Sequence, residues 1–352
     1  MLLEFPEYYE NFHCIGGVCP DSCCAGWEVD VDAESCDYYQ TVPGRFGERL
    51  RRQLISEGEE RYFPLTGDRR CPFLNRENLC EIYIELGEEA LCQVCTEYPR
   101  YFMEAGQYQQ MDMSLSCMEL SRIFFSEEGP IRYFRAEDAS EGEVLSSEEE
   151  AKLAELLSLR NACIAFIQEG AETGESGDRF WDSLTEMLSA VFSEQREVWE
   201  GTAEGFLSAA LSDLPQRFRR LETLDERWTD FTAALNGLLE WESAEALVSE
   251  FRLVFRTEYG RCFRRLAAYF LFRYCIDSFY EDSMADILRL LLRSLRTIEL
   301  MAAVRLRQQG SYRLSDMIDT VHLFSKEVEH AEENVACFKS AEACGERILR
   351  EI

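Results

Sequence analysis

Apolar residues recur at steps of three and four residues through most of the chain after residue 150. This period runs through Leu153, Leu156, Leu157, Ile164 and Ile167, through Leu184, Leu188 and Val191, and through Leu247, Phe251, Val254 and Phe255. Such a period marks helices with one buried face. Only two prolines, Pro130 and Pro215, follow Gly129, which suits long helices. The pattern predicts an all-helical domain over residues 151–352, with its clearest internal break at 170–177.

The first 125 residues show a different pattern. Apolar and acidic residues alternate at 27–31, which predicts a short strand, and short helices are expected at 47–57 and 88–94. Six of the eight prolines fall in this region, which indicates many turns. Residues 126–150 are predicted to be a linker, because a turn sequence at 126–130 opens the segment and residues 137–150 are acidic and poor in apolar side chains. Ser147 with Glu150 predicts a capping box that opens a helix at residue 148.

Charge narrows the classes of partner. The net charge of the 352 residues is −31. An acidic surface repels phosphate backbones, so we expect no direct binding of nucleic acid. The charge serves either as a solubilising surface or as a field that attracts a cationic partner, such as a protein that presents lysines.

The beginning of the chain and its apolar segments bear on the compartment. Residues 1–7 have neither a basic nor an apolar stretch, so we expect no signal peptide. The longest apolar segment, around 288–304, is interrupted by Arg289, Arg293, Arg296 and Glu299, so we expect no membrane span. The expected location is the cytoplasm, where thiols stay reduced and clustered cysteines bind metals or take part in catalysis. An extracellular disulfide scaffold is the alternative.

Ten of the 15 cysteines fall in the first 117 residues. Eight of them form the pattern that predicts metal ligands: Cys14, Cys19, Cys23, Cys24, Cys71, Cys80, Cys95 and Cys117. Eight thiols suffice for two four-coordinate sites, or for one iron–sulfur cluster and a second metal. The adjacent side chains of Cys23 and Cys24 point in different directions and so can serve two sites. The roles of Cys36 and Cys92 remain open. The predicted fold is mostly α, with a small irregular cysteine-rich metal-binding domain (residues 1–125) packed on an all-helical C-terminal body.

Four motifs in this region carry a resemblance to a known family. They are Cys14-Ile-Gly-Gly-Val-Cys-Pro-Asp-Ser-Cys-Cys-Ala-Gly-Trp27, Cys71-Pro-Phe-Leu74 with Leu79-Cys-Glu-Ile-Tyr83, Cys95-Thr-Glu-Tyr-Pro-Arg100, and Ser114-Leu-Ser-Cys117. In order and spacing they resemble the flagellin lysine-N-methylases, within a wider group of cysteine-rich zinc- or iron-chelating domains. The resemblance covers roughly residues 12 to 120.

The resemblance implies a protein-lysine N-methyltransferase. It would transfer methyl groups from S-adenosylmethionine to surface lysines of flagellin. It would also carry a cysteine-ligated iron–sulfur cluster, of the 4Fe-4S kind, with zinc as the alternative metal.

A stretch rich in aromatic residues and arginines is the candidate site for the methyl donor. Between residues 252 and 273 it holds six arginines against one acid, Glu258, in a chain that is otherwise acidic. The stretch is either a core helix whose arginines pair with acids, or a pocket in which Arg252, Arg256 and Tyr259 hold the carboxylate or adenine of S-adenosylmethionine. The Gly-x-Gly-x-x-Gly fingerprint is missing, so a standard dinucleotide site is not expected. No catalytic base stands out.

Two other functions compete with methyl transfer. The first is an iron–sulfur protein that transfers electrons. The second is a non-enzymatic metal-binding adaptor that docks a partner through its acidic helices. A smaller expectation concerns Arg100, which either pairs with an acid such as Asp21 or is an ordinary surface residue.

Overall fold

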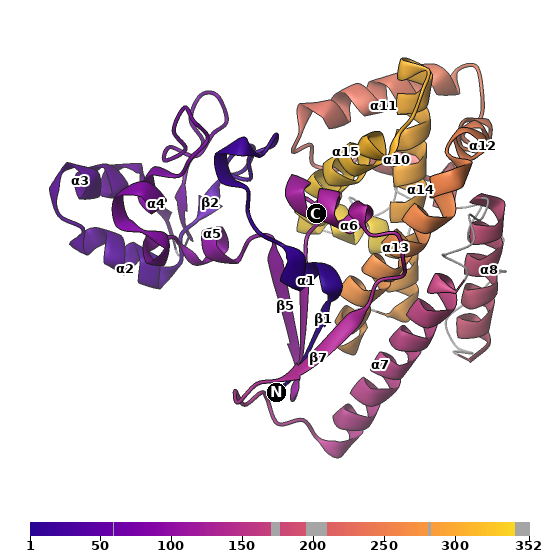
Figure 1. Ribbon diagram of the computed structural model, residues 1–352, viewed down its shortest axis with the longest axis horizontal. Helices are drawn as coiled ribbons and strands as arrows, with labels where there is room; N and C mark the ends of the chain where they lie inside the picture. Colours follow the sequence, from indigo (N-terminus) through magenta and orange to yellow (C-terminus); the bar gives the residue numbers. More distant parts are fainter. Residues whose placement is uncertain (59, 170–176, 195–209, 281–282, 342–352) are drawn as a thin grey trace, which may run out of the picture.

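The computed structural model describes all residues except 59, 170–176, 195–209, 281–282 and 342–352. It is mostly helical, with a smaller, irregular part at one side (Figure 1). We call residues 13–98 the lobe and the remainder the body. Most of the break predicted at 170–177 lies outside the described residues, and helix α8 begins at Gly177. In the described part of the chain, no helix has the length and apolar character needed to cross a membrane.

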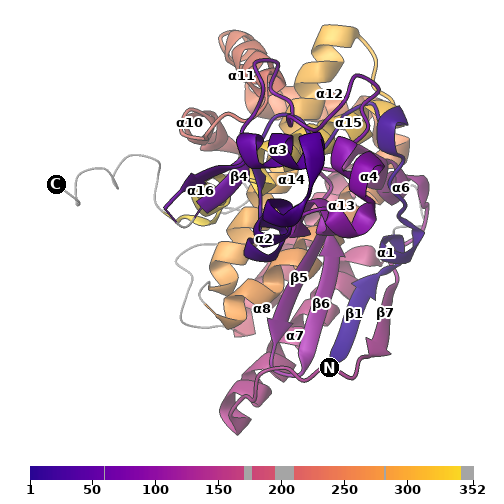
Figure 2. The same cartoon turned by 90° about the vertical axis from the view of Figure 1, so that its left-hand side faces the viewer.

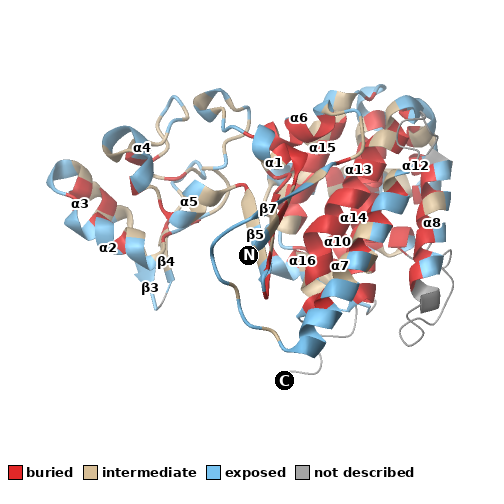
Figure 3. Cartoon of the chain, turned by 60° about the horizontal axis from the view of Figure 1, so that its bottom comes forward, coloured by how far each residue is buried: buried red, intermediate tan, exposed pale blue. Residues whose placement is uncertain are grey.

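The body is built around two long central helices. They are α13 (Arg256–Cys275) and α14 (Met284–Gln309). Around them lie α7 (Ser147–Gln168), α8 (Gly177–Glu194), α10 (Leu214–Phe218), α11 (Glu226–Leu239), α12 (Ala244–Val254), α15 (Leu314–Phe324) and α16 (Glu332–Lys339). A single π-helical turn, η4 (Ser325–Glu329), continues α15, and the short η3 (Ile276–Phe279) follows α13. Burial is densest along α13 and α14 (Figure 3), so the helical period of the sequence is confirmed for this half.

The first helix of this half starts one residue earlier than predicted. Its N-cap is Ser146, which accepts a hydrogen bond from the backbone of Glu149, and the Glu149 carboxylate accepts one from the backbone of Ser146. Ser147 and Glu150 offer the same pair of residue types one position later. The capping box is therefore present, but its register could not be chosen from the sequence.

A four-stranded sheet lies against the helices (Figure 2). Its order is β5 (Arg100–Ala105), β6 (Tyr108–Met113), β1 (Leu2–Pro6) and β7 (Tyr133–Glu137), with β1 parallel to β6 and antiparallel to β7. Arg160 of α7, 1% exposed, binds Glu4 and donates to Gln110 at 2.7 Å, which fixes the sheet on the helices. Two short helices, α1 (Glu7–Asn11) and α6 (Met118–Ser126), complete the body.

The sheet adds to the expected architecture. Every element described within residues 151–352 is helical, as predicted, but strands from the first 137 residues pack on these helices. Strand β7 lies inside the segment 126–150 that was predicted as a linker. Its residues are mostly exposed because it is an edge strand, and its backbone pairs with β1.

The lobe is inserted between α1 and β5. It contains α2 (Ala33–Thr41), α3 (Gly44–Gln53), α4 (Glu81–Leu86), α5 (Gln93–Glu97), two short 3₁₀ helices, η1 (Gly16–Val18) and η2 (Glu88–Ala90), and a small sheet of β2 (Val29–Asp30), β4 (Glu60–Phe63) and β3 (Ile55–Glu57). Helices thus occur near both places where they were predicted. The lobe has its own small apolar core, around Tyr39, Phe63 and Phe73.

Candidate active site

A pocket of about 580 Å³ opens where the lobe meets the body. The lobe contributes Asp21, Ser22, Cys23, Ala25, Gly26, Trp27, Gly67, Asp68, Arg69 and Tyr98, and the body contributes Ser116, Leu224, Asp225, Glu226, Arg227, His322, Lys326 and His330. Arg69 bridges the two parts, donating to the carbonyl oxygens of Gly26 at 2.9 Å and Leu224 at 3.2 Å. The pocket has the size of sites that bind small organic ligands.

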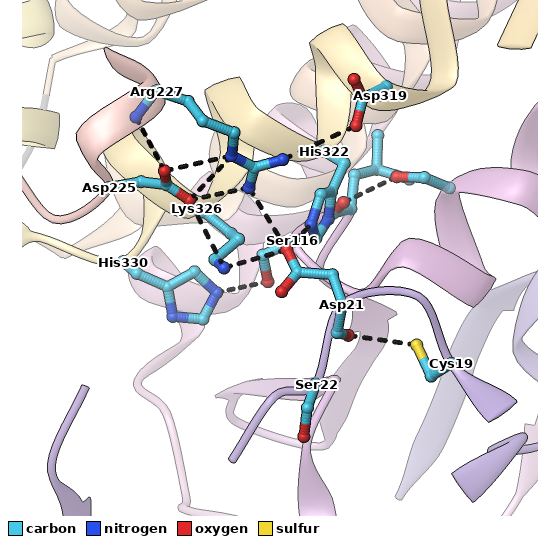
Figure 4. A network of polar contacts seen from close by, with 12 residues as sticks. Cys19, Asp21, Ser22, Ser116, Asp225, Arg227, Asp319, His322, Lys326 and His330 are labelled. Carbon is cyan, nitrogen blue, oxygen red and sulfur yellow. Dashed lines mark hydrogen bonds and ion pairs between the residues drawn. The ribbon is translucent and has the colours of Figure 1, made fainter. Parts of the chain in front are cut away.

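The carboxylate of Asp21 is the centre of a polar network in this pocket (Figure 4). Its Oδ2 atom lies 2.6 Å from Nε2 of His322 and accepts hydrogen bonds from Lys326 at 3.1 Å and Arg227 at 3.2 Å. Burial alone would raise the pKa of Asp21. The hydrogen bond from His322 and the charge of Lys326 outweigh it and hold that pKa well below its usual range. Asp21 is therefore a carboxylate at neutral pH.

A second carboxylate, Asp225, faces the same cations. It caps α11, accepts a hydrogen bond from Arg227 at 2.7 Å, and lies 3.7 Å from Nζ of Lys326. The backbone amides of Leu224 and Asp225 donate to the buried carboxyl group of Glu327 at 3.0 and 2.9 Å. Burial raises the pKa of Glu327 to about 7, in spite of those two donors. Glu327 thus fixes the segment that carries Asp225.

Aromatic side chains and a histidine form the other wall. The Trp27 indole donates to the carbonyl oxygen of Cys23 at 2.7 Å, and its ring lies 6.4 Å from that of Tyr98. Nε2 of His330 is 2.5 Å from the hydroxyl of Ser116. His330 is exposed when the whole residue is counted, but its ring loses water in the pocket and lies near Arg273 and Lys326, which lowers its pKa to about 4. The ring is neutral at neutral pH.

The cysteines of the lobe gather around a separate, small cavity. It measures about 20 Å³, and Cys24, Cys71, Cys80, Cys92 and Cys95 line it together with apolar side chains such as Phe63 and Phe73. The Sγ atoms of Cys92 and Cys95 lie 3.4 Å apart, and burial raises the pKa of Cys71 to about 12. Four of the eight predicted ligands are thus together, and Cys92, which the sequence pattern left aside, joins them.

The other four predicted ligands are Cys14, Cys19, Cys23 and Cys117. They do not line this cavity. Cys23 shares a hydrogen bond with Cys24 that raises the pKa of Cys23, and the charges of Cys117 and Cys14 raise it further. Cys117, whose pKa burial raises to about 11, is affected in turn by Cys19 and Cys14. The adjacent Cys23 and Cys24 therefore stand between two sets of thiols.

A metal in the lobe can be tested against these positions. The donor set is made of thiols alone, which suits zinc or iron–sulfur clusters. Within the described residues, however, no three His, Cys, Asp or Glu side chains stand in positions that could hold one metal ion. The ten cysteines from Cys14 to Cys117 form no disulfide with one another, so the alternative of a disulfide scaffold has no support here. The chemistry of the ligands fits a metal, whereas their positions do not form a ligand shell.

The residues predicted to bind the methyl donor lie elsewhere. Arg252 donates to Glu299 at 2.6 Å, and the hydroxyl of the fully buried Tyr259 binds the same carboxylate. Arg256 is exposed at the start of α13. None of the three lines the pocket at the junction. Their role in cofactor binding stays a prediction. Arg252 and Tyr259 already bind the buried carboxylate of Glu299 in the core.

Arg100 does not pair with Asp21. Its guanidinium lies over the rings of Tyr9 and Phe12, at 5.8 and 5.7 Å from their centres. Asp21 instead contacts His322, Lys326 and Arg227 of the body.

The pocket residues of the body were missed at the level of sequence, although one signal was available. His322, Lys326 and His330 are spaced by four residues, which places them on one face of a helix. Two of the chain's three histidines share this face. The contacts of Asp21 with them could not be inferred from sequence, because 301 positions separate Asp21 from His322.

Comparison with known proteins gives a family. Residues 151–342 match the family model described as the FliB lysine N-methylase C-terminal domain. Over 127 residues, 34% of this chain, the sequence is 28% identical to the lysine-N-methylases of Salmonella choleraesuis and Salmonella typhimurium and to the flagellar biosynthetic protein FliU of Salmonella muenchen. The match spans 31% of each lysine-N-methylase and 74% of FliU. No solved structure matches the chain.

Proposed function

Because this chain belongs to the family of FliB lysine N-methylases, we propose that it is a protein-lysine N-methyltransferase that acts on flagellin and uses S-adenosylmethionine. The observation that carries the proposal is the pocket at the junction. It joins the cysteine-rich lobe to helices of the matched domain, and it offers carboxylates and aromatic rings to a cationic ligand. Both a lysine side chain and a sulfonium are such ligands.

The pocket residues have separate tasks in this reaction. S-adenosylmethionine supplies a methyl group on a positively charged sulfur. Asp21 and Asp225 attract cations and orient them in the pocket. The lysine amine must lose a proton before its nitrogen bonds to the methyl carbon as the methyl–sulfur bond breaks. His330 is too weak a base to keep that proton, since its pKa is about 4, so the proton leaves to water. Trp27 and Tyr98 exclude water from one wall.

The lobe completes the proposal as a metal-binding part. Cys24, Cys71, Cys80, Cys92 and Cys95 would hold a metal at the cavity they line, and Cys14, Cys19, Cys23 and Cys117 would supply a second set of ligands. An iron–sulfur cluster of the 4Fe-4S kind, or zinc, would add folding energy to a lobe whose apolar core is small. We place the protein in the cytoplasm, where these thiols stay reduced.

The methyltransferase proposal is tested with purified protein, flagellin and S-adenosylmethionine. Mass spectrometry of the flagellin should show lysines that gain methyl groups. Asp225→Asn should lower kcat/KM about tenfold or more, because a hydrogen-bonded charge is lost from the pocket. Asp230→Asn, an exposed acid on the same helix, is the matched control and should act like the wild type. Absence of methylation with flagellin would overturn the proposal.

The thiol-lined cavity favours one other function, electron transfer by a metal cluster. Anaerobic absorption spectra with and without reductant separate the two. A cluster that cycles readily while methylation is unaffected would favour electron transfer. An adaptor without enzymatic activity would show no heat on titration with S-adenosylmethionine.

A further inference from the structure

Lys326 places an ammonium group of the protein's own inside the pocket. Its Nζ atom donates to Asp21 at 3.1 Å and lies 3.7 Å from a carboxylate oxygen of Asp225, and its side chain is 22% exposed. It approaches from η4, in the body, and meets the lobe at Asp21. A lysine side chain thus already contacts two of the pocket's carboxylates, Asp21 and Asp225, beside Arg227, which binds both.

Lysine is a rare residue in this chain. Of the 36 lysines and arginines only three are lysines: Lys152, Lys326 and Lys339. Lys152 binds the carbonyl oxygen of Phe279 at 2.7 Å, and Lys339 binds Asp277 at 3.1 Å, both away from the pocket. Nearly all other ion pairs of the body are made by arginines. The lysine at this position is therefore a departure from the chain's general use of arginine.

The pocket also contains a polar group that lacks a partner. His322 lines the pocket and is 1% exposed, and its Nδ1 atom has no hydrogen-bond partner among the described residues. A buried nitrogen without a partner costs free energy unless a ligand or water binds it. This unpartnered nitrogen is an observation independent of the acidic residues, on a ring whose other nitrogen contacts Asp21 in the pocket.

We propose that Asp21 and Asp225 form the binding site for the ammonium group of the substrate lysine, and that Lys326 occupies this site until the substrate displaces it. The inference rests on the proposed function and deepens it, since it assigns the lysine subsite. Arginine in place of Lys326 would hold both carboxylates through a planar fork and would be harder to displace. A lysine, bound as a point charge at 3.1 and 3.7 Å, can leave.

A direct consequence is competition. Lys326 is tethered beside the carboxylates, so its effective concentration is high and it weakens the apparent affinity for a substrate lysine. Removing its charge should tighten binding of the substrate. Replacing Lys326 with arginine, which would bind the two carboxylates more firmly, should weaken binding of the substrate.

The experiment measures binding without the methyl donor, on the whole chain of 352 residues. The probe is a five-residue peptide with one central lysine, and the same peptide with norleucine is its control; titration calorimetry gives both affinities. Lys326→Met should bind the lysine peptide about threefold or more tightly than the wild type, and Lys326→Arg more weakly. Lys339→Met, which removes an acid-paired lysine outside the pocket, should leave the affinity unchanged. Asp225→Asn should weaken binding about tenfold.

The outcomes separate this inference from the proposed function. Equal affinities for Lys326→Met and Lys339→Met would overturn the subsite, even if flagellin is methylated. Equal binding of the lysine and norleucine peptides would overturn it as well. Tighter binding by Lys326→Met with no methylation of flagellin would support a lysine-binding pocket and refute the methyltransferase. The test uses Asp225→Asn and not a change at Asp21, because Asp225 lies far from the cysteines in sequence. A substitution at Asp21 would also alter the lobe.

Discussion

Nε2 of His322 lies 2.6 Å from Oδ2 of Asp21, although 301 positions separate the two residues in the chain. Asp21 belongs to the lobe between two cysteines, and His322 belongs to α15 of the body. Together with Lys326 and Arg227, this contact fastens the lobe to the helices. The carboxylate of Asp21 thus helps, with Arg69, to join two parts of the chain that fold around different cores.

Asp21→Asn should loosen this junction. At neutral pH we expect a loss of about 1–3 kcal/mol in the free energy of unfolding, because three donors lose a charged acceptor. The pKa of Asp21 is lowered in the folded protein, so the stabilisation is present above the ordinary aspartate pKa and fades as the pH falls below about 4. Chemical denaturation at several pH values measures the difference. Asp37→Asn, an exposed acid of α2, is the control, and an equal loss in both variants would contradict the prediction.

Glu327→Gln should change the pH dependence in the opposite sense. Burial raises the pKa of Glu327 from 4.5 to about 7, so the folded protein holds a proton that the unfolded chain has lost. Stability from this group is therefore complete below the unfolded pKa and is lost as the pH rises towards 7. The stability of Glu327→Gln relative to the wild type should therefore rise by about 1–3 kcal/mol as the pH increases from about 5 to about 8, which unfolding experiments measure. A constant difference over that range would show that Glu327 is ionised throughout.

Glu299→Gln should be among the most damaging changes in the body. The fully buried Glu299 accepts hydrogen bonds from Arg252 at 2.6 Å and Arg296 at 2.8 Å, and it also binds Tyr259. Loss of its charge leaves two guanidinium groups without a counterion, at a cost of about 3–5 kcal/mol. Thermal unfolding measures this cost, with Glu245→Gln, exposed on α12, as the control.

The same region allows a test of the predicted donor site. Arg256 is exposed, so Arg256→Ala should fold normally. If the pocket at the junction binds S-adenosylmethionine, calorimetry should give this variant the affinity of the wild type. A loss of affinity would support the site predicted at Arg252, Arg256 and Tyr259.

Cys92→Ser should lose metal as completely as Cys95→Ser. Both cysteines line the small cavity, and their sulfurs are 3.4 Å apart. Elemental analysis and absorption spectra of anaerobically purified protein measure the metal. Cys36→Ser is the matched control, since Cys36 belongs to the same lobe but not to the cavity, and should keep the wild-type content. Metal retained by Cys92→Ser would limit the ligands to the eight predicted from sequence.

The sequence was informative where structure depends on local pattern. The helices of the body follow from the spacing of their apolar residues, and the capping box at Ser146 was predicted with an error of one position. The motif cysteines were identified from spacing, and the structure brings four of them to one cavity. Cys92 was left aside because it lies outside the motifs. Its side chain reaches the cavity only because the lobe folds around it.

The sequence was uninformative where structure depends on distant contacts. Strand β7 leads directly into the acidic run 137–150, and only pairing with β1 makes it a strand. The arginine-rich stretch was considered as a pocket, yet Arg252, on α12, binds Glu299 of α14, 47 positions away. The acids of the junction pocket were hidden among the chain's 67 aspartates and glutamates. Only the folded chain distinguishes Asp21 and Asp225 from the rest.

The position of β1 inside the sheet makes the lobe an internal cassette. The guanidinium of Arg100, just after the lobe, lies 5.7 Å from the centre of the Phe12 ring, just before it. The two ends of the lobe therefore lie side by side where they join the body. Replacement of residues 13–98 by a short graft would spare every strand of the larger sheet. Trimming from the amino terminus would instead remove a strand that has neighbours on both sides. Ligands that the grafted protein still binds would be those that the body binds without the lobe.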